Sequence, residues 1–77
     1  MKLSWDEAKR QATLNSRKLD FATAAEVFNG LHFTREDVRQ DYGERRYITA
    51  GYLAERLVVL VWTARGDVRH VIDEESQ

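Results

Sequence analysis

The chain has 77 residues, enough for one domain, and its 43% hydrophobic and 32% charged residues are typical of a globular protein. A net charge of −1, from 12 Lys and Arg against 13 Asp and Glu, argues against a protein that coats nucleic acid through bulk positive charge. The absence of cysteine excludes disulfides and thiolate metal sites, and no apolar run reaches the ~18 residues of a membrane span. We therefore expect one cytoplasmic domain over residues 1–77.

Two helices are predicted in the first 30 residues. Residues 4–18 form the first, with Ser4 and Glu7 spaced as a capping box and Asp6 as a competing N-cap. Residues 21–29 form the second, because Phe21, Ala24, Ala25 and Phe28 fall on one face at helical spacing. Asn29-Gly30 supplies its stop signal.

Strands are predicted from residue 31 onward. Short strands are expected at 31–35 and 46–53, and the unbroken apolar run 57–62 is typical of a central strand covered on both faces. Residues 65–67 supply a turn into a last strand at 68–72. The expected fold is therefore α+β, with two N-terminal helices packed on a four-stranded antiparallel sheet.

Positively charged side chains are the groups that could carry chemistry. They are Lys9, Arg46, Arg65, Arg69 and His70, with Glu44 close to Arg46 in sequence. Metal-free RNA cleavage needs a base for the 2′-hydroxyl, cations on the phosphate and an acid for the leaving oxygen, and such a set can supply all three. From composition alone, however, surface charges or ion pairs are the more common explanation of such residues.

Four segments in register resemble one known family. They are Leu3-x-Trp5-Asp6-x-x-Lys9, then Leu19-Asp20-Phe21-x-x-Ala24-x-x-Val27-Phe28, then Asp41-Tyr42-Gly43-Glu44-x-Arg46 with Thr49-x-Gly51, and Val61-Trp62-Thr63-x-Arg65-Gly66-Asp67. The chain resembles the BrnT ribonuclease toxins of type II toxin–antitoxin modules, which share a RelE-like fold. The resemblance runs from residue 3 to about residue 72.

The resemblance implies a function, a partner and a set of site residues. It implies a metal-independent ribonuclease without cofactor, which cleaves mRNA and is neutralised by a ribbon-helix-helix antitoxin (BrnA-like) in a cytoplasmic hetero-oligomer. DNA would be contacted only through the antitoxin, and no membrane is involved. The resemblance aligns Lys9, Glu44, Arg46 and Arg65 with the family's RNA-cleavage cleft, whereas His70 stands where the family usually has an arginine. We expect all five to be catalytic residues, with Arg17, Lys18 and Arg69 as possible RNA-phosphate contacts.

Two departures from the family pattern leave an alternative open. Arg17 stands where the family commonly has a histidine, and an arginine cannot act as a general base. The chain ends in Asp73-Glu74-Glu75-Ser76-Gln77, where the family continues into a basic helix, and added acids should repel RNA. The alternative is therefore a catalytically weakened BrnT-like interaction or regulatory module. A frameshifted ending is a third interpretation.

Overall fold

A computed structural model describes residues 2–77. The elements follow in the order β1 (Lys2–Trp5), α1 (Glu7–Arg17), a 3₁₀ turn (Phe21–Thr23), α2 (Ala24–Asn29), β2 (His32–Glu36), β3 (Tyr47–Leu53), β4 (Arg56–Arg65) and β5 (Val68–Ser76). The strands form one five-stranded sheet in the order β1-β5-β4-β3-β2. Strand β1 runs parallel to β5, whereas all the other neighbouring pairs are antiparallel.

The predicted four-stranded antiparallel sheet is therefore wrong, because a fifth strand precedes the first helix. Ser4 belongs to β1, and the helix begins at Glu7 with Asp6 as its N-cap, whose carboxylate accepts the Lys9 amide. Leu3 and Trp5 pack against the core while Ser4 points to the other side of the sheet. The Ser4–Glu7 spacing imitates a capping box, but burial of Leu3 and Trp5 favours the strand.

The remaining predicted elements are present with shifted bounds. The second helix begins as a 3₁₀ turn capped by Asp20, whose carboxylate accepts the Ala22 amide, and continues as α2. The last strand reaches Ser76 rather than residue 72, with an irregularity in its pairing at Val61/Trp62. None of the helices within residues 2–77 is long and apolar enough to cross a membrane.

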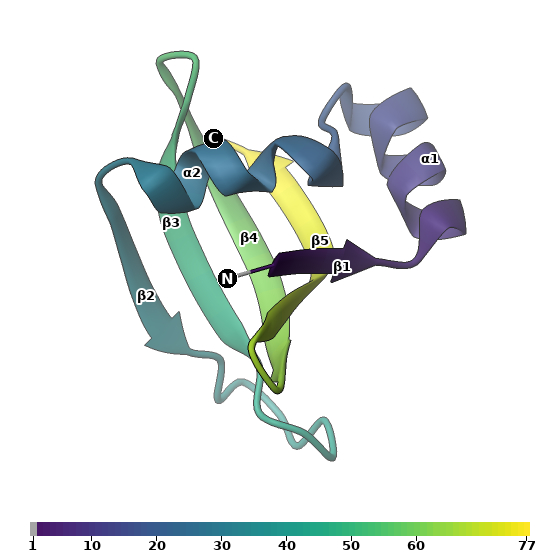
Figure 1. The fold of residues 1–77 in the computed structure, drawn as a ribbon, viewed down its shortest axis with the longest axis vertical. Coiled ribbons are helices and arrows are strands. Elements are labelled where there is room, and N and C mark those ends of the chain that lie inside the picture. The colour runs from purple at the N-terminus through teal and green to yellow at the C-terminus, as the bar shows by residue number, and fades with distance from the viewer. Residues whose placement is uncertain (1) are drawn as a thin grey trace.

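Helix α2 lies across one face of the sheet, and α1 lies beside the edge formed by β1 and β5 (Figure 1). The core fills the space under α2. Its fully buried apolar side chains include Phe21, Val27, Val58, Leu60 and Val71. We call this side of the sheet the inner face.

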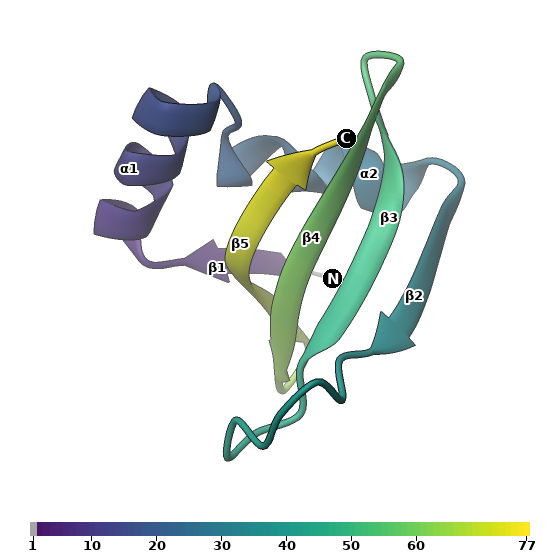
Figure 2. The same cartoon turned by 180° about the vertical axis from the view of Figure 1, so that it is seen from behind.

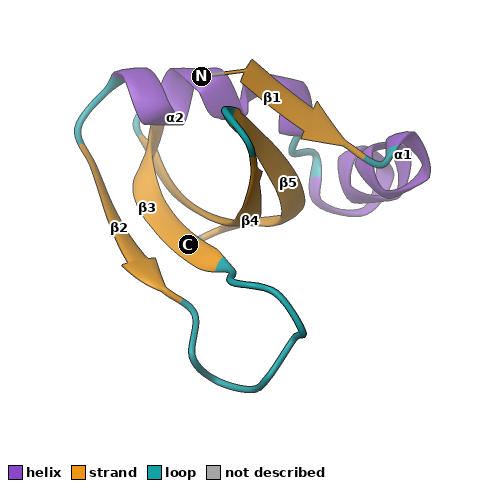
Figure 3. Ribbon diagram, turned by 60° about the horizontal axis from the view of Figure 1, so that its bottom comes forward, coloured by secondary structure: helices purple, strands orange, loops and turns teal. Residues whose placement is uncertain are grey.

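The opposite side of the sheet, the outer face, has no helix over it (Figure 2). On β4, Val58 and Leu60 point inward and are buried, whereas Val59 and Val61 point outward and are only half-buried. The expectation that this strand is covered on both faces is therefore wrong for the chain by itself. The loop of residues 37–46 extends on the side of the sheet away from α2 (Figure 3).

Candidate functional site

His70 lies at the centre of the candidate site, on the outer face of β5. It is paired with Thr63 of β4 on one side and with Ser4 of β1 on the other. The Ser4 hydroxyl lies 2.8 Å from His70 Nδ1, so one ring nitrogen is held and Nε2 remains for a second partner. Residues from the first and last strands thus meet in one hydrogen bond.

Four charged groups act on the imidazole. Partial burial lowers the pKa of His70 below its ordinary value, the Arg65 and Lys9 cations lower it further, and the Glu44 and Asp6 carboxylates oppose this. The net direction is down, so the ring is mostly neutral at pH 7. We call Ser4, Lys9, Glu44, Arg65 and His70 the His70 cluster.

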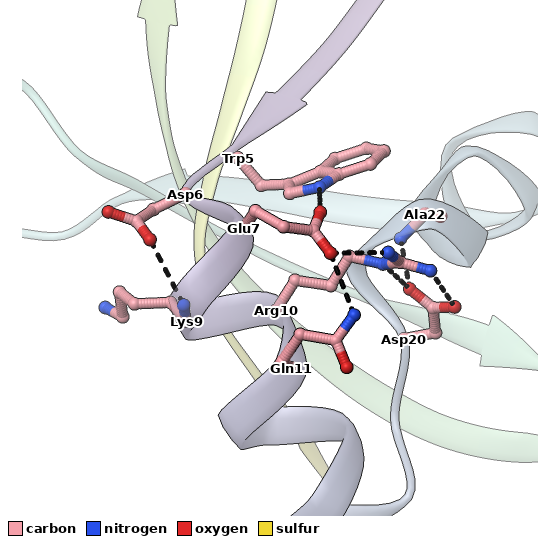
Figure 4. A network of polar contacts seen from close by, with 8 residues as sticks. All are labelled: Trp5, Asp6, Glu7, Lys9, Arg10, Gln11, Asp20 and Ala22. Atoms are coloured by element: carbon pink, nitrogen blue, oxygen red, sulfur yellow. Dashed lines mark hydrogen bonds and ion pairs between the residues drawn. The ribbon is translucent and has the colours of Figure 1, made fainter.

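Lys9 enters this cluster because the first turn of α1 is fixed by its cap. Lys9 and Asp6 lie on one side of the helix, while Glu7 and Arg10 lie on the other (Figure 4). Arg10 binds Asp20 through two nitrogens, at 2.6 and 3.0 Å, and also binds Glu7 at 2.9 Å. This network joins α1 to the start of the second helical segment and leaves the Lys9 ammonium exposed.

Arg46 reaches the site from the loop before β3. Its Nε lies 3.3 Å from Glu44 Oε2, and its guanidinium lies 4.2 Å from the centre of the Tyr42 ring. The Thr63 hydroxyl donates to the Arg45 carbonyl at 2.7 Å, which ties this end of the loop to β4 beside His70. Arg46 therefore lies next to the His70 cluster in space as well as in sequence.

A buried carboxylate, Asp37, organises the loop that carries these residues. Asp37 accepts hydrogen bonds from the Arg39 guanidinium at 2.7 and 2.8 Å and from the Tyr42 hydroxyl at 3.0 Å. The Arg39 guanidinium holds the pKa of Asp37 well below its usual range. The Asp37 amide donates to the Arg46 carbonyl at 2.7 Å, so one residue fixes both Tyr42 and Arg46.

The structure does not bring the three possible RNA-phosphate contacts into the cluster. Arg17 donates to Asp73 and to the Glu74 carbonyl at the edge of β5, and Lys18 donates to the Asn15 carbonyl at the far end of α1. Arg69 points to the inner face, with its guanidinium 3.9 Å from the centre of the Phe28 ring. Burial lowers the pKa of Arg69, and its Nε has no hydrogen-bond partner within residues 2–77.

The sequence did not predict Ser4, Asp6 or Thr63 as residues of the site, nor the supporting role of Asp37. The alternation Leu3–Ser4–Trp5 was the available signal for an outward-facing Ser4 on a strand. No sequence signal links Asp37 to Tyr42, because that contact depends on how the loop closes. Within residues 2–77, no group of three or more His, Asp or Glu side chains is placed to hold a metal ion.

These observations define a small α+β protein with exposed cations arranged around a neutral, oriented imidazole. Such a site can bind a phosphodiester and move a proton next to it.

The family follows from comparison with known sequences. The model described as "Ribonuclease toxin, BrnT, of type II toxin-antitoxin system" matches residues 5–73, so the chain belongs to the BrnT family. The family identifies it as a ribonuclease toxin of a toxin–antitoxin system, whose partner is an antitoxin protein. No curated protein sequence matches the chain.

Proposed function

We propose that the chain cleaves RNA without a metal ion, at the His70 cluster. The single observation that carries this proposal is the placement of His70, hydrogen-bonded through Nδ1 to Ser4 and within electrostatic reach of Lys9, Glu44 and Arg65. A base that is neutral at pH 7 and lies among cations suits attack of a 2′-hydroxyl on the neighbouring phosphate.

Each of these groups has a separate role in the reaction. In the tautomer that carries its proton on Nδ1 and donates it to Ser4, the Nε2 lone pair of His70 takes the proton of the 2′-hydroxyl as the 2′-oxygen bonds to phosphorus. Arg65 and Arg46 neutralise the phosphate oxygens, as planar guanidinium groups do well. The bond from phosphorus to the 5′-oxygen breaks, and the Lys9 ammonium supplies the proton to that oxygen. The products are a 2′,3′-cyclic phosphate and a 5′-hydroxyl.

Glu44 completes this arrangement. Its carboxylate favours the imidazolium that forms when His70 takes the proton, and it also binds Arg46 at 3.3 Å. The Glu44→Ala variant should therefore lower cleavage less than His70→Ala does. The same substitution should also free the Arg46 guanidinium.

The test is cleavage of a single-stranded RNA in the presence of EDTA. We expect His70→Ala to lower the rate by about 100-fold or more and Arg65→Ala by at least about tenfold. Arg56→Ala is the matched control for Arg65→Ala, because Arg56 is an exposed arginine at the opposite end of β4, and its rate should stay within about twofold of wild type. Loss of wild-type cleavage in EDTA, or an unchanged rate for His70→Ala, would overturn the proposal.

We further propose, on the family resemblance, that the substrate is mRNA, that the antitoxin is of the ribbon-helix-helix type and that the protein acts in the cytoplasm. The catalytically weakened alternative has one structural observation in its favour: Asp73 and Glu75 point to the outer face, which also carries His70. Arg17 offsets these acids, at 2.8 Å from Asp73 and 3.6 Å from Glu75. Growth arrest by wild type but not by His70→Ala, expressed without antitoxin, would exclude the alternative.

A further inference from the structure

The outer face carries an apolar surface that the chain leaves uncovered. Ile48 and Ala50 of β3 and Val59 and Val61 of β4 point to this side, and each is only partly buried. Phe33 and Tyr52, at its border, are 73% and 58% exposed. The unbroken apolar run of β4 has the composition of a strand buried on both faces, yet only its inner half is covered.

The charges across the outer face follow a fixed order. Strand pairing places Arg35, Ile48, Val61 and Asp73 in one row from β2 to β5, and Phe33, Ala50, Val59 and Glu75 in the next row. The strand residues at the centre of the face are thus apolar, one border carries Arg35 and the other carries two carboxylates. Arg39, from the loop of residues 37–46, lies beside this centre, because it lines one hollow with Ile48, Val59 and Val61. Arg17 reaches those carboxylates from α1 and leaves the Asp73 side chain 38% exposed.

The apolar surface also contains a hollow. It has a volume of about 100 Å³ and is lined by Arg39, Ile48, Val59, Val61, Asp73 and Glu75. Half of these residues are apolar and half are charged, so the hollow suits one side chain with an apolar stem and a polar end.

We propose that the outer face binds an amphipathic helix of the antitoxin. A helix is about 10 Å across and strands lie about 4.8 Å apart, so one helix covers β3 and β4 while its flanks reach β2 and β5. The helix presents an apolar stripe to Val59 and Val61, basic residues to Asp73 and Glu75, and acidic residues to Arg35. The sheet would then be covered on both sides, with α2 on the inner face.

The position of this helix accounts for inhibition, a consequence that rests on the ribonuclease proposal. The row beyond Ile48 and Val61 contains Thr63 and His70 on the same face. Thr63 is itself covered by the loop through the Arg45 carbonyl, so the helix ends before that row and places its acidic end towards Arg46 and Arg65, where RNA phosphates are expected. The same helix thus buries the apolar surface and covers the Arg46 and Arg65 cations.

The test measures binding of the cognate antitoxin, titrated into the labelled 77-residue chain. Val61→Lys should raise the Kd by at least about 30-fold, because the new ammonium meets the apolar stripe. Arg35→Glu should raise it by about fivefold or more, because an acidic flank would then face an acid. Ala25→Lys is the matched control, since it adds the same charge at an exposed site on α2, and it should change the Kd by less than about twofold.

Two further measurements separate the possible outcomes. Thermal unfolding checks that Val61→Lys folds, and Arg35→Glu, at an exposed position, supplies an independent result if it does not. If both variants bind the antitoxin within about threefold of wild type, the proposal is overturned. It is also overturned if the chain alone sediments as a dimer that Val61→Lys dissociates, because a second copy then occupies the face. RNA cleavage by the free variants is assayed in parallel, so failure of the ribonuclease proposal leaves the binding result intact.

Discussion

Replacing Glu74 by methionine should raise the stability of the protein at pH 8 by about 3 kcal/mol. Glu74 lies on β5 opposite Leu60 and is fully buried, and neither carboxylate oxygen has a hydrogen-bond partner within residues 2–77. Burial, with the Asp20 and Asp73 carboxylates nearby, raises the pKa of Glu74 from 4.5 to about 7. The folded state therefore disfavours the charged form that the unfolded chain adopts at neutral pH.

The sign of the effect follows from proton binding. Between pH 4.5 and about 7 the folded state holds more protons on Glu74 than the unfolded state does, so stability falls as the pH rises through this window. At about 1.4 kcal/mol per pKa unit, the whole fall is about 3 kcal/mol. Methionine is uncharged and of similar length, so it removes this pH dependence while filling the same space.

The assay is urea unfolding of wild type and Glu74→Met at several pH values from 4.5 to 8. The difference in free energy of unfolding between the two should be small at pH 4.5 and grow to about 3 kcal/mol at pH 8, a Tm difference of ~10–20 °C. Glu75→Met is the control, because it makes the same replacement at the next residue of β5, which is exposed rather than buried. A constant difference for Glu74→Met, or a less stable variant at pH 8, would refute the assignment of a buried, unpartnered carboxyl.

Three other substitutions test how the fold holds the site. Gly51→Ala should destabilise the protein by about 1–3 kcal/mol in chemical unfolding, because the added Cβ would lie 2.7 Å from Val27 Cγ1; an unchanged midpoint would show that α2 moves aside. Asp37→Asn should lower the Tm and speed amide hydrogen exchange in residues 37–46. If the exchange rates are unchanged, Asp37 does not stabilise that loop. Ser4→Ala should lower RNA cleavage by about tenfold and shift its pH profile, whereas a purely structural role would leave the profile in place.

Helices and strands could be predicted from the sequence where one pattern of apolar side chains extends along the whole element. The spacing of Phe21, Ala24 and Phe28 indicates a helix, and the apolar run at 57–62 indicates a central strand, and both are present. Strand β1 could not be predicted in this way, because it has only four residues and its partner, β5, lies at the other end of the chain. A parallel strand with a distant partner has no local hydrogen-bonding signature.

The candidate site was predictable in its residue types but not in its assembly. Lys9, Glu44, Arg65 and His70 do come together, although they lie on four separate segments. Arg69 could have been excluded from the site of His70 from the sequence, because adjacent residues of a strand point to opposite faces of the sheet. Asp37 could not have been found, since its importance comes from burial and from Tyr42, which only the folded loop provides.

The candidate site is assembled from the beginning, the middle and the end of the chain, and this arrangement connects the proposed catalysis with the proposed binding of the antitoxin. His70 is held by Ser4, 66 residues away, while Arg46 is held by a loop that closes through Asp37. Val61, at the centre of the proposed helix-binding surface, lies two residues from Thr63, which joins that loop to β4 beside His70. A helix pressed on the outer face therefore contacts the same strands that position the imidazole. Substitutions that loosen β4 or β5 should weaken antitoxin binding and RNA cleavage together, whereas a substitution confined to Lys9 should affect cleavage first.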